Sequence, residues 1–186
     1  MAEIKGVLLN AQTLFLRNHF NEIELEQAKG TLTPQAAALL KPKYLDAVWY
    51  PYETSVALRH LMRALPLRRE LDPVNVGAFI GQHTFTGVYS SLLANDAAKL
   101  VTNMPFLHGL VYRDWCALEP RLSGERSCAI VYGQMSEGVK PSRAVCQSLI
   151  GFWAKVLELG IGTPVSGAHP SCVCEGQPRC EFTFAW

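Results

Sequence analysis

The sequence lacks the long charged and apolar runs that mark nucleic-acid-binding and membrane-spanning chains. Its 186 residues include 17 basic and 16 acidic side chains, a net charge of +1, and no basic run is longer than Leu67-Arg68-Arg69. A nucleic-acid partner is therefore not expected. No stretch approaches the roughly 20 apolar residues that cross a bilayer, and the N-terminal segment has no small-residue cleavage site. We therefore expect a cytoplasmic protein without a membrane span.

Catalytic motifs are missing as well. The chain has no phosphate-binding glycine loop, no nucleophile elbow and no His-Glu-x-x-His helix. Internal repeats, low-complexity tracts and linkers are also absent from the sequence. We therefore expect residues 1–186 to form a single domain that is not an enzyme.

Apolar periodicity divides the chain into two parts. Hydrophobic residues make up 49% of it, which excludes disorder and supplies a substantial core. Periodicity and cap signals predict helices in the first part, with Pro105 kinking or splitting the last of them, over residues 6–19, 22–29, 33–40, 54–65, 73–94 and 97–115. The pattern then predicts one helix and three strands, over residues 142–158 and over 125–134, 163–166 and 181–186.

These elements predict an α+β fold. Residues 1–116 form a mainly helical part, about two thirds of the chain, and residues 117–186 form a small antiparallel sheet with a crossing helix. The aromatic segment 48–52, which a proline interrupts, is expected to be a connection. In the first strand Cys128, Ile130 and Tyr132 share one face, and in the last strand Cys180, Phe182 and Phe184 do so.

Three of the six cysteines lie near a histidine. His169, Cys172 and Cys180 belong to one loop before the last strand, and Cys146 opens a helical segment. Three thiolates and an imidazole are a usual ligand set for tetrahedral zinc. Disulfides are disfavoured because the chain is neither short nor secreted in character. We therefore expect a structural zinc ion, with buried or redox-active thiols as the alternative. Cys174 is a spare thiol that alternation along the chain points away.

This spacing resembles a known signature. The pattern His169-x-x-Cys172-x-x-x-Gly176-x-x-x-Cys180, with Cys146 upstream, resembles the C-terminal part of vinyl-reductase-like domains. Those domains include the aromatic-effector sensor domains of phenol-responsive transcription activators, whose zinc is held by a cysteine, a glutamate and two further cysteines. The resemblance implies that His169 takes the place of the glutamate.

The whole chain also resembles a large bacterial paralogous family of uncharacterised function. The similarity rests on Lys5-Gly6-Val7, on Trp49-Tyr50-Pro51, on the residues around Cys180 and on the terminal Trp186. Both resemblances imply the fold that haem nitric-oxide sensors share with vesicle-tethering subunits. In that fold, helices pack on an antiparallel sheet of about four strands.

Aromatic residues on two predicted helices form a candidate ligand site. His108, Tyr112 and Trp115 fall on one helical face, and the preceding helix carries His83 and Tyr89. These residues could form a pocket for a small apolar or aromatic molecule. The alternative, which we favour from the sequence alone, is an ordinary core face with a hydrogen-bonded histidine, because pockets are few and aromatic faces are common.

One histidine lies in a segment that resembles part of a haem site. The segment from Met104 to His108 resembles the one that brings the proximal histidine in haem nitric-oxide sensors. In those sensors a Tyr-x-Ser-x-Arg motif binds the haem carboxylates, and it would fall near Tyr132. The chain reads Tyr132-Gly133-Gln134-Met135-Ser136, with neither serine nor arginine in place. The sequence therefore argues against haem.

Two functions follow from the sequence. In the first, the protein is a small-molecule sensor or carrier that combines a structural zinc with an apolar or aromatic pocket and signals through a partner protein. In the second, it is a protein-interaction module without a pocket. Haem-based gas sensing through His108 ranks below both. Homodimerisation is expected in either case, and a cavity near His108 would favour the first function.

Overall fold

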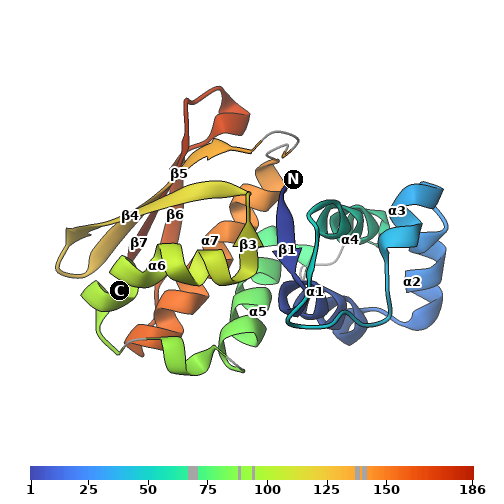
Figure 1. The fold of residues 1–186 in the computed structure, drawn as a ribbon, viewed down its shortest axis with the longest axis horizontal. Coiled ribbons are helices and arrows are strands. Elements are labelled where there is room, and N and C mark those ends of the chain that lie inside the picture. The colour runs from blue at the N-terminus through green and yellow to red at the C-terminus, as the bar shows by residue number, and fades with distance from the viewer. Residues whose placement is uncertain (67–70, 88, 94, 137–138, 140–141) are drawn as a thin grey trace.

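The computed structural model of the chain shows an α+β fold with two antiparallel sheets among the residues that it describes (Figure 1). These are residues 1–66, 71–87, 89–93, 95–136, 139 and 142–186. The α+β prediction is confirmed. The basic run at 67–69 and the helix end expected near Ala94 lie outside the described residues.

Four helices occupy the first part of the chain and lie together at one side of Figure 1: α1 (Gly6–His19), α2 (Glu22–Lys29), α3 (Pro34–Leu39) and α4 (Glu53–Ala64). Two of these helices begin at residues whose side chains cap the first turn. Asn21 and Glu24 form a capping box at α2, in which each side chain accepts the other's backbone N–H at 2.9 Å. Thr33 caps α3 ahead of a first-turn proline. The predicted helices of this part are therefore present.

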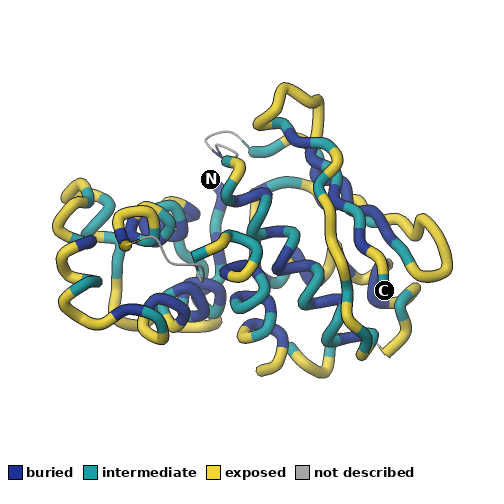
Figure 2. The backbone as a smooth tube through the Cα atoms, turned by 180° about the vertical axis from the view of Figure 1, so that it is seen from behind, coloured by how far each residue is buried: buried dark blue, intermediate teal, exposed yellow. Residues whose placement is uncertain are grey.

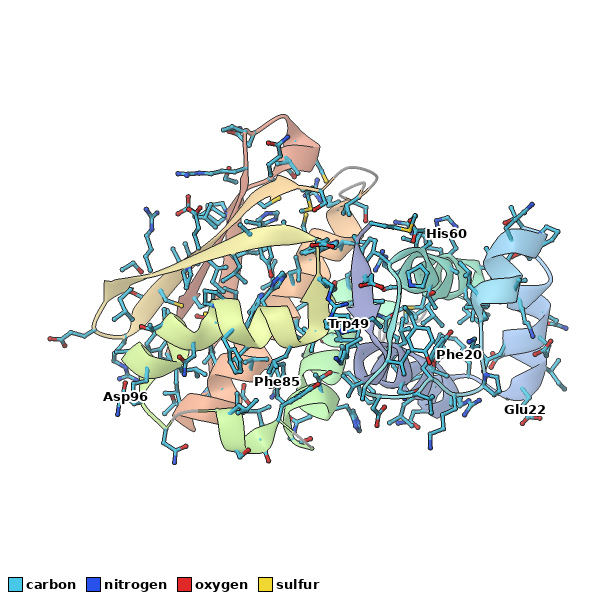
Figure 3. All side chains as sticks on the ribbon, viewed as in Figure 1. Phe20, Glu22, Trp49, His60, Phe85 and Asp96 are labelled. Atoms are coloured by element: carbon cyan, nitrogen blue, oxygen red, sulfur yellow. The ribbon has the colours of Figure 1, made fainter. Side chains whose placement is uncertain are left out.

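A small sheet joins this helical part to the rest of the molecule. Its strands β1 (Glu3–Lys5), β2 (Trp49–Pro51) and β3 (Tyr112–Arg113) pair in the order β2-β1-β3. The segment expected to be a connection is therefore a strand, too short to show a period of two. Trp49, labelled in Figure 3, lies between two cations, with Lys5 Nζ 4.1 Å and the Arg113 guanidinium carbon 4.3 Å from its ring centroid.

Two helices and a short turn follow. α5 (Pro73–Phe85) ends earlier than expected, and a 3-10 turn, η2 (Ser90–Leu92), precedes α6 (Ala97–Val111). Pro105 lies inside α6 and does not split it. Buried residues on both sides of the proline, including Leu100 and Leu107 at 0% exposure, hold the helix to the core. Their burial outweighs the hydrogen bond that the proline removes.

The second sheet contains β4 (Cys116–Gly124), β5 (Ser127–Met135), β6 (Ser166–Ser171) and β7 (Cys180–Ala185) in the order β4-β5-β7-β6. Its central register pairs the two predicted apolar faces, with Ile130 opposite Phe182 and Tyr132 opposite Cys180. Strand β4 was missed because Pro120 interrupts its pattern. Proline is tolerated there because β4 is an edge strand.

Helix α7 (Arg143–Ile161) lies between this sheet and α5 (Figure 1). It is long and apolar enough by length and composition to cross a membrane, so the expectation that no such stretch exists is wrong. Half of its apolar window is buried inside the structure, and Trp153, Val156 and Leu157 are fully buried. Figure 2 shows buried backbone concentrated in the centre of the molecule. Part of the helix therefore packs in the core of the molecule.

Candidate functional site

Four predicted ligands lie together at one end of the second sheet. Cys146, His169, Cys172 and Cys180 each offer one ligand atom, and these atoms all lie within 4.8 Å of one another. The three cysteines are each 1% exposed and His169 is half-buried. The sequence prediction therefore named a set of residues that the fold does bring together.

Local structure explains how the four residues meet. Cys146 lies in the first turn of α7, where its N–H donates to the Ser142 carbonyl at 3.0 Å. Cys172 precedes a 3-10 turn, η3 (Val173–Glu175), and Cys180 begins β7. Gly176 ends the turn at φ +82°, a left-handed conformation that glycine adopts without strain. The turn reverses the chain and returns Cys180 to Cys172.

The sulfur spacing suits a tetrahedral metal ion. Cys146 Sγ lies 3.8 Å from Cys180 Sγ and 3.8 Å from Cys172 Sγ. A tetrahedral ion with metal–sulfur bonds of about 2.3 Å separates its ligand sulfurs by about 3.8 Å. A hydrogen bond from the Cys146 thiol lowers the pKa of Cys180 to about 5, and the Val173 N–H, 3.5 Å from Cys180 Sγ, acts in the same direction. The cluster thus already favours a thiolate at Cys180.

His169 and Cys174 behave differently next to this cluster. The His169 ring stacks on Phe182, with ring centroids 4.2 Å apart and an interplanar angle of 2°. Its Nε2 is buried without a hydrogen-bond partner among the described residues. Cys174 is exposed and does not belong to the group of four. Of these two side chains, only His169 lies close enough to the three buried cysteines to be the fourth metal ligand.

The aromatic residues of α6 and its C-terminal side form a buried cluster. The His108 ring centroid lies 5.0 Å from that of Tyr112, 5.8 Å from Trp115 and 5.6 Å from Tyr132. Burial lowers the pKa of His108 to about 4, so the imidazole is neutral at pH 7. His108 Nε2 and Trp115 Nε1 are both buried without a partner among the described residues. Two unpaired polar atoms in one cluster are unusual.

Two further predicted ligand residues lie elsewhere. His83 is exposed on α5, where its ring packs on Phe79 at a centroid distance of 4.2 Å. Tyr89 follows α5 and packs on Phe85, which Figure 3 labels, at 5.8 Å. Among the described residues, no ring contact joins either of them to His108. Of the five predicted ligand residues, the structure brings together His108, Tyr112 and Trp115.

A cavity of about 170 Å³ lies between the N-terminal helices and the α5–α7 pair. Its walls are mainly apolar, and Tyr112 is the residue that they share with the His108 cluster. The sequence reading missed Gln12, Arg59 and Arg63, which also line it. Periodicity predicts the helix that carries the two arginines, but it cannot show that one of its faces meets a cavity.

Comparisons with known proteins show the fold and no closer relationship. No family model and no curated protein matches the chain. Solved structures of similar shape include H-NOX proteins. The Fe(II) unliganded H-NOX protein of K. algicida is 12% identical, with a TM-score of 0.67, and the match covers 98% of this chain and 96% of that one. The Fe(II)NO form of the S. oneidensis protein is 14% identical, with a TM-score of 0.63 and coverage of 97% and 98%.

A third match corrects our cofactor expectation. It is a protein solved in work on modulating haem redox potential through porphyrin distortion, 10% identical over 98% of this chain and 100% of that one, with a TM-score of 0.64. We expected a structural zinc and argued against haem. This expectation is contradicted, because the third structure, which has the same fold, comes from work on a haem protein.

The fold named from sequence is confirmed, whereas the family names are not. The H-NOX structures have the fold that both resemblances implied. No match supports the vinyl-reductase-like domains or the bacterial paralogous family. At 10–14% identity the matches show the fold alone.

Proposed function

We propose that the protein is a small-molecule sensor domain whose ligand occupies the cavity between the N-terminal helices and the α5–α7 pair. The observation that carries this proposal is the cavity itself, about 170 Å³ and walled mainly by apolar side chains. An engineered cavity of about 150 Å³ with apolar walls binds benzene. Tyr112 lines the cavity and contacts His108 of α6. A bound ligand that shifts Tyr112 would therefore also shift α6 and the second sheet. A protein-interaction module would not require such a space.

Benzyl alcohol, a neutral one-ring probe, is expected to bind the cavity. At 100 times its Kd it would stabilise the protein by about 2.7 kcal/mol and raise the Tm by about 5–10 °C. Val76→Phe should abolish this rise, because Val76 lines the cavity and is 7% exposed. The matched control is Ile23→Phe, at a position that is 70% exposed on α2. Differential scanning calorimetry measures the shift, and an equal shift in the Val76→Phe protein would contradict the assigned site.

The four-residue cluster supports a second element of the proposal, a metal ion that joins the start of α7 to the turn before β7. Cys146, His169, Cys172 and Cys180 would be its ligands. Four protein ligands leave no open position for a substrate, so the ion would serve folding and not catalysis. Cytoplasmic localisation, a partner protein for signalling, homodimerisation and the single-domain organisation of residues 1–186 also stay predictions.

Haem is the second candidate ligand, and His108 is the observation that favours it. The imidazole is neutral and its buried Nε2 has no partner among the described residues, as an axial donor requires. Haem would supply an iron centre for a diatomic gas. The Tyr112 ring contacts the His108 ring and also lines the cavity.

Titration of the purified protein with hemin tests this candidate. One equivalent should produce a sharpened Soret band, and His108→Ala should remove it because the axial nitrogen is lost. The control is His83→Ala, since His83 is exposed on α5 and outside the cluster. Circular dichroism of both variants checks the fold. A Soret band that is the same in the His108→Ala protein would exclude axial ligation by His108.

A further inference from the structure

The cavity between the N-terminal helices and the α5–α7 pair has an unbalanced charge. Two arginines of α4, Arg59 and Arg63, are among its walls. None of the described residues that line it is acidic. Among the described residues, no carboxylate forms an ion pair with either arginine. A positive group that faces an apolar space without a counter-ion favours an anionic occupant.

Arg59 is held in a fixed orientation. Its Nη1 donates to Ser55 Oγ at 2.7 Å and its Nη2 donates to the Tyr52 hydroxyl at 3.0 Å. Ser55 is itself bonded to the Gln12 amide, which donates to Ser55 Oγ at 3.0 Å. Gln12 and Ser55 are 5% and 0% exposed, so this network is anchored in the core. A guanidinium oriented in advance loses less entropy when it binds an anion.

Much of the remaining wall is apolar. Val76 and Ile80 of α5 and Leu149 and Phe152 of α7 line the cavity. The volume of about 170 Å³ is close to the roughly 150 Å³ that accepts a single benzene ring. An occupant that matches both the arginines and the apolar side chains has one ring and one negative group.

We propose that the cavity binds an aromatic monocarboxylate, with the carboxylate on Arg59 and the ring against the apolar side chains that α5 and α7 contribute to the wall. This inference rests on the proposed sensor function, for which it names the ligand class. A carboxylate can accept charge-assisted hydrogen bonds from the remaining N–H groups of the Arg59 fork. The ring contributes the apolar burial that anchors one-ring ligands in such cavities.

Isothermal titration at constant ionic strength, with benzoate, benzyl alcohol and inorganic phosphate as probes, tests the proposal. Benzoate should bind at least about tenfold more tightly than benzyl alcohol, because it adds a charge-assisted contact. Arg59→Gln should weaken benzoate binding by about 10- to 100-fold and leave benzyl alcohol within about threefold. Arg63→Gln should weaken benzoate by less than about fivefold, because Arg63 is exposed. Arg59→Lys keeps the charge and should bind benzoate with intermediate affinity.

The outcomes separate this inference from the sensor function. Equal affinity for benzoate and benzyl alcohol, or benzoate binding unchanged by Arg59→Gln, would overturn the carboxylate inference and leave the ligand cavity in place. Phosphate binding as tight as benzoate would also overturn it, because Arg59 would then be a general anion site. Failure of benzyl alcohol to stabilise the protein in the calorimetric experiment would instead count against the cavity as a site for neutral ligands.

Discussion

Replacing Cys180 by serine is expected to release the metal ion and to lower the Tm by about 10 °C or more. The free energy of binding a four-ligand metal ion is also folding free energy, which reaches about 10–16 kcal/mol in small zinc-dependent peptides. In a chain of this size each kcal/mol changes the Tm by about 2–4 °C. Cys180 Sγ lies 3.8 Å from Cys146 Sγ and accepts the Val173 N–H, so its loss opens the centre of the cluster. Elemental analysis and calorimetry of the purified protein give the two readouts.

The control for this prediction is Cys174→Ser. Cys174 is a thiol of the same loop, but it is exposed and outside the group of four. Its replacement should leave metal content and Tm unchanged. A chelator should lower the Tm of the native protein towards that of the Cys180→Ser variant and have no effect on the variant. Cobalt(II) added to the metal-free protein should give intense thiolate-to-metal absorption that the variant lacks. A native protein that contains no metal and melts normally would refute the site.

The metal cluster was predictable from sequence because its residues are close in the chain. His169 lies in β6, Cys172 follows that strand and Cys180 begins β7, so a single turn brings them together. Thiol and imidazole side chains are recognisable as metal ligands in a sequence, and Gly176 indicates the turn between them. Cys146 is remote in sequence, and its place depended on α7 crossing the sheet. The longer periodic helices and the alternation in β5 and β7 were predictable for the same reason, since each is a local pattern.

The cavity was not predictable because no local pattern defines it. Its walls come from α1, α4, α5 and α7, and a hydrophobic helical face looks the same in sequence whether it meets another helix or a space. The short strands β1, β2 and β3 escaped prediction because two or three residues cannot show alternation. The cofactor expectation was wrong although the fold was expected, because the cysteine motif and the missing serine and arginine after Tyr132 were given more weight than the fold.

Gly151→Ala is the second change with a large expected effect, and it tests the helix pair that forms one side of the cavity. A methyl group on Gly151 would overlap the Val74 carbonyl oxygen and the Ala78 nitrogen of α5. Across the same contact, a methyl on Gly77 would overlap the Ser148 carbonyl oxygen of α7. The two backbones thus touch through glycines. Backbone atoms cannot rotate away, so α5 and α7 would have to separate and the packing between them would open.

The expected result is a loss of about 3 kcal/mol, the upper range for overpacking, and a Tm lower by about 6–12 °C. The matched control is Gly109→Ala, on the exposed side of α6, where an added methyl meets nothing within 4 Å. That change should stabilise the protein by about 0.5–1 kcal/mol, because alanine favours the helix more than glycine does. The same substitution is thus expected to act in opposite directions on two helices. A Gly151→Ala protein that melts at or above the native Tm would show that α5 and α7 do not approach as closely as this structure requires.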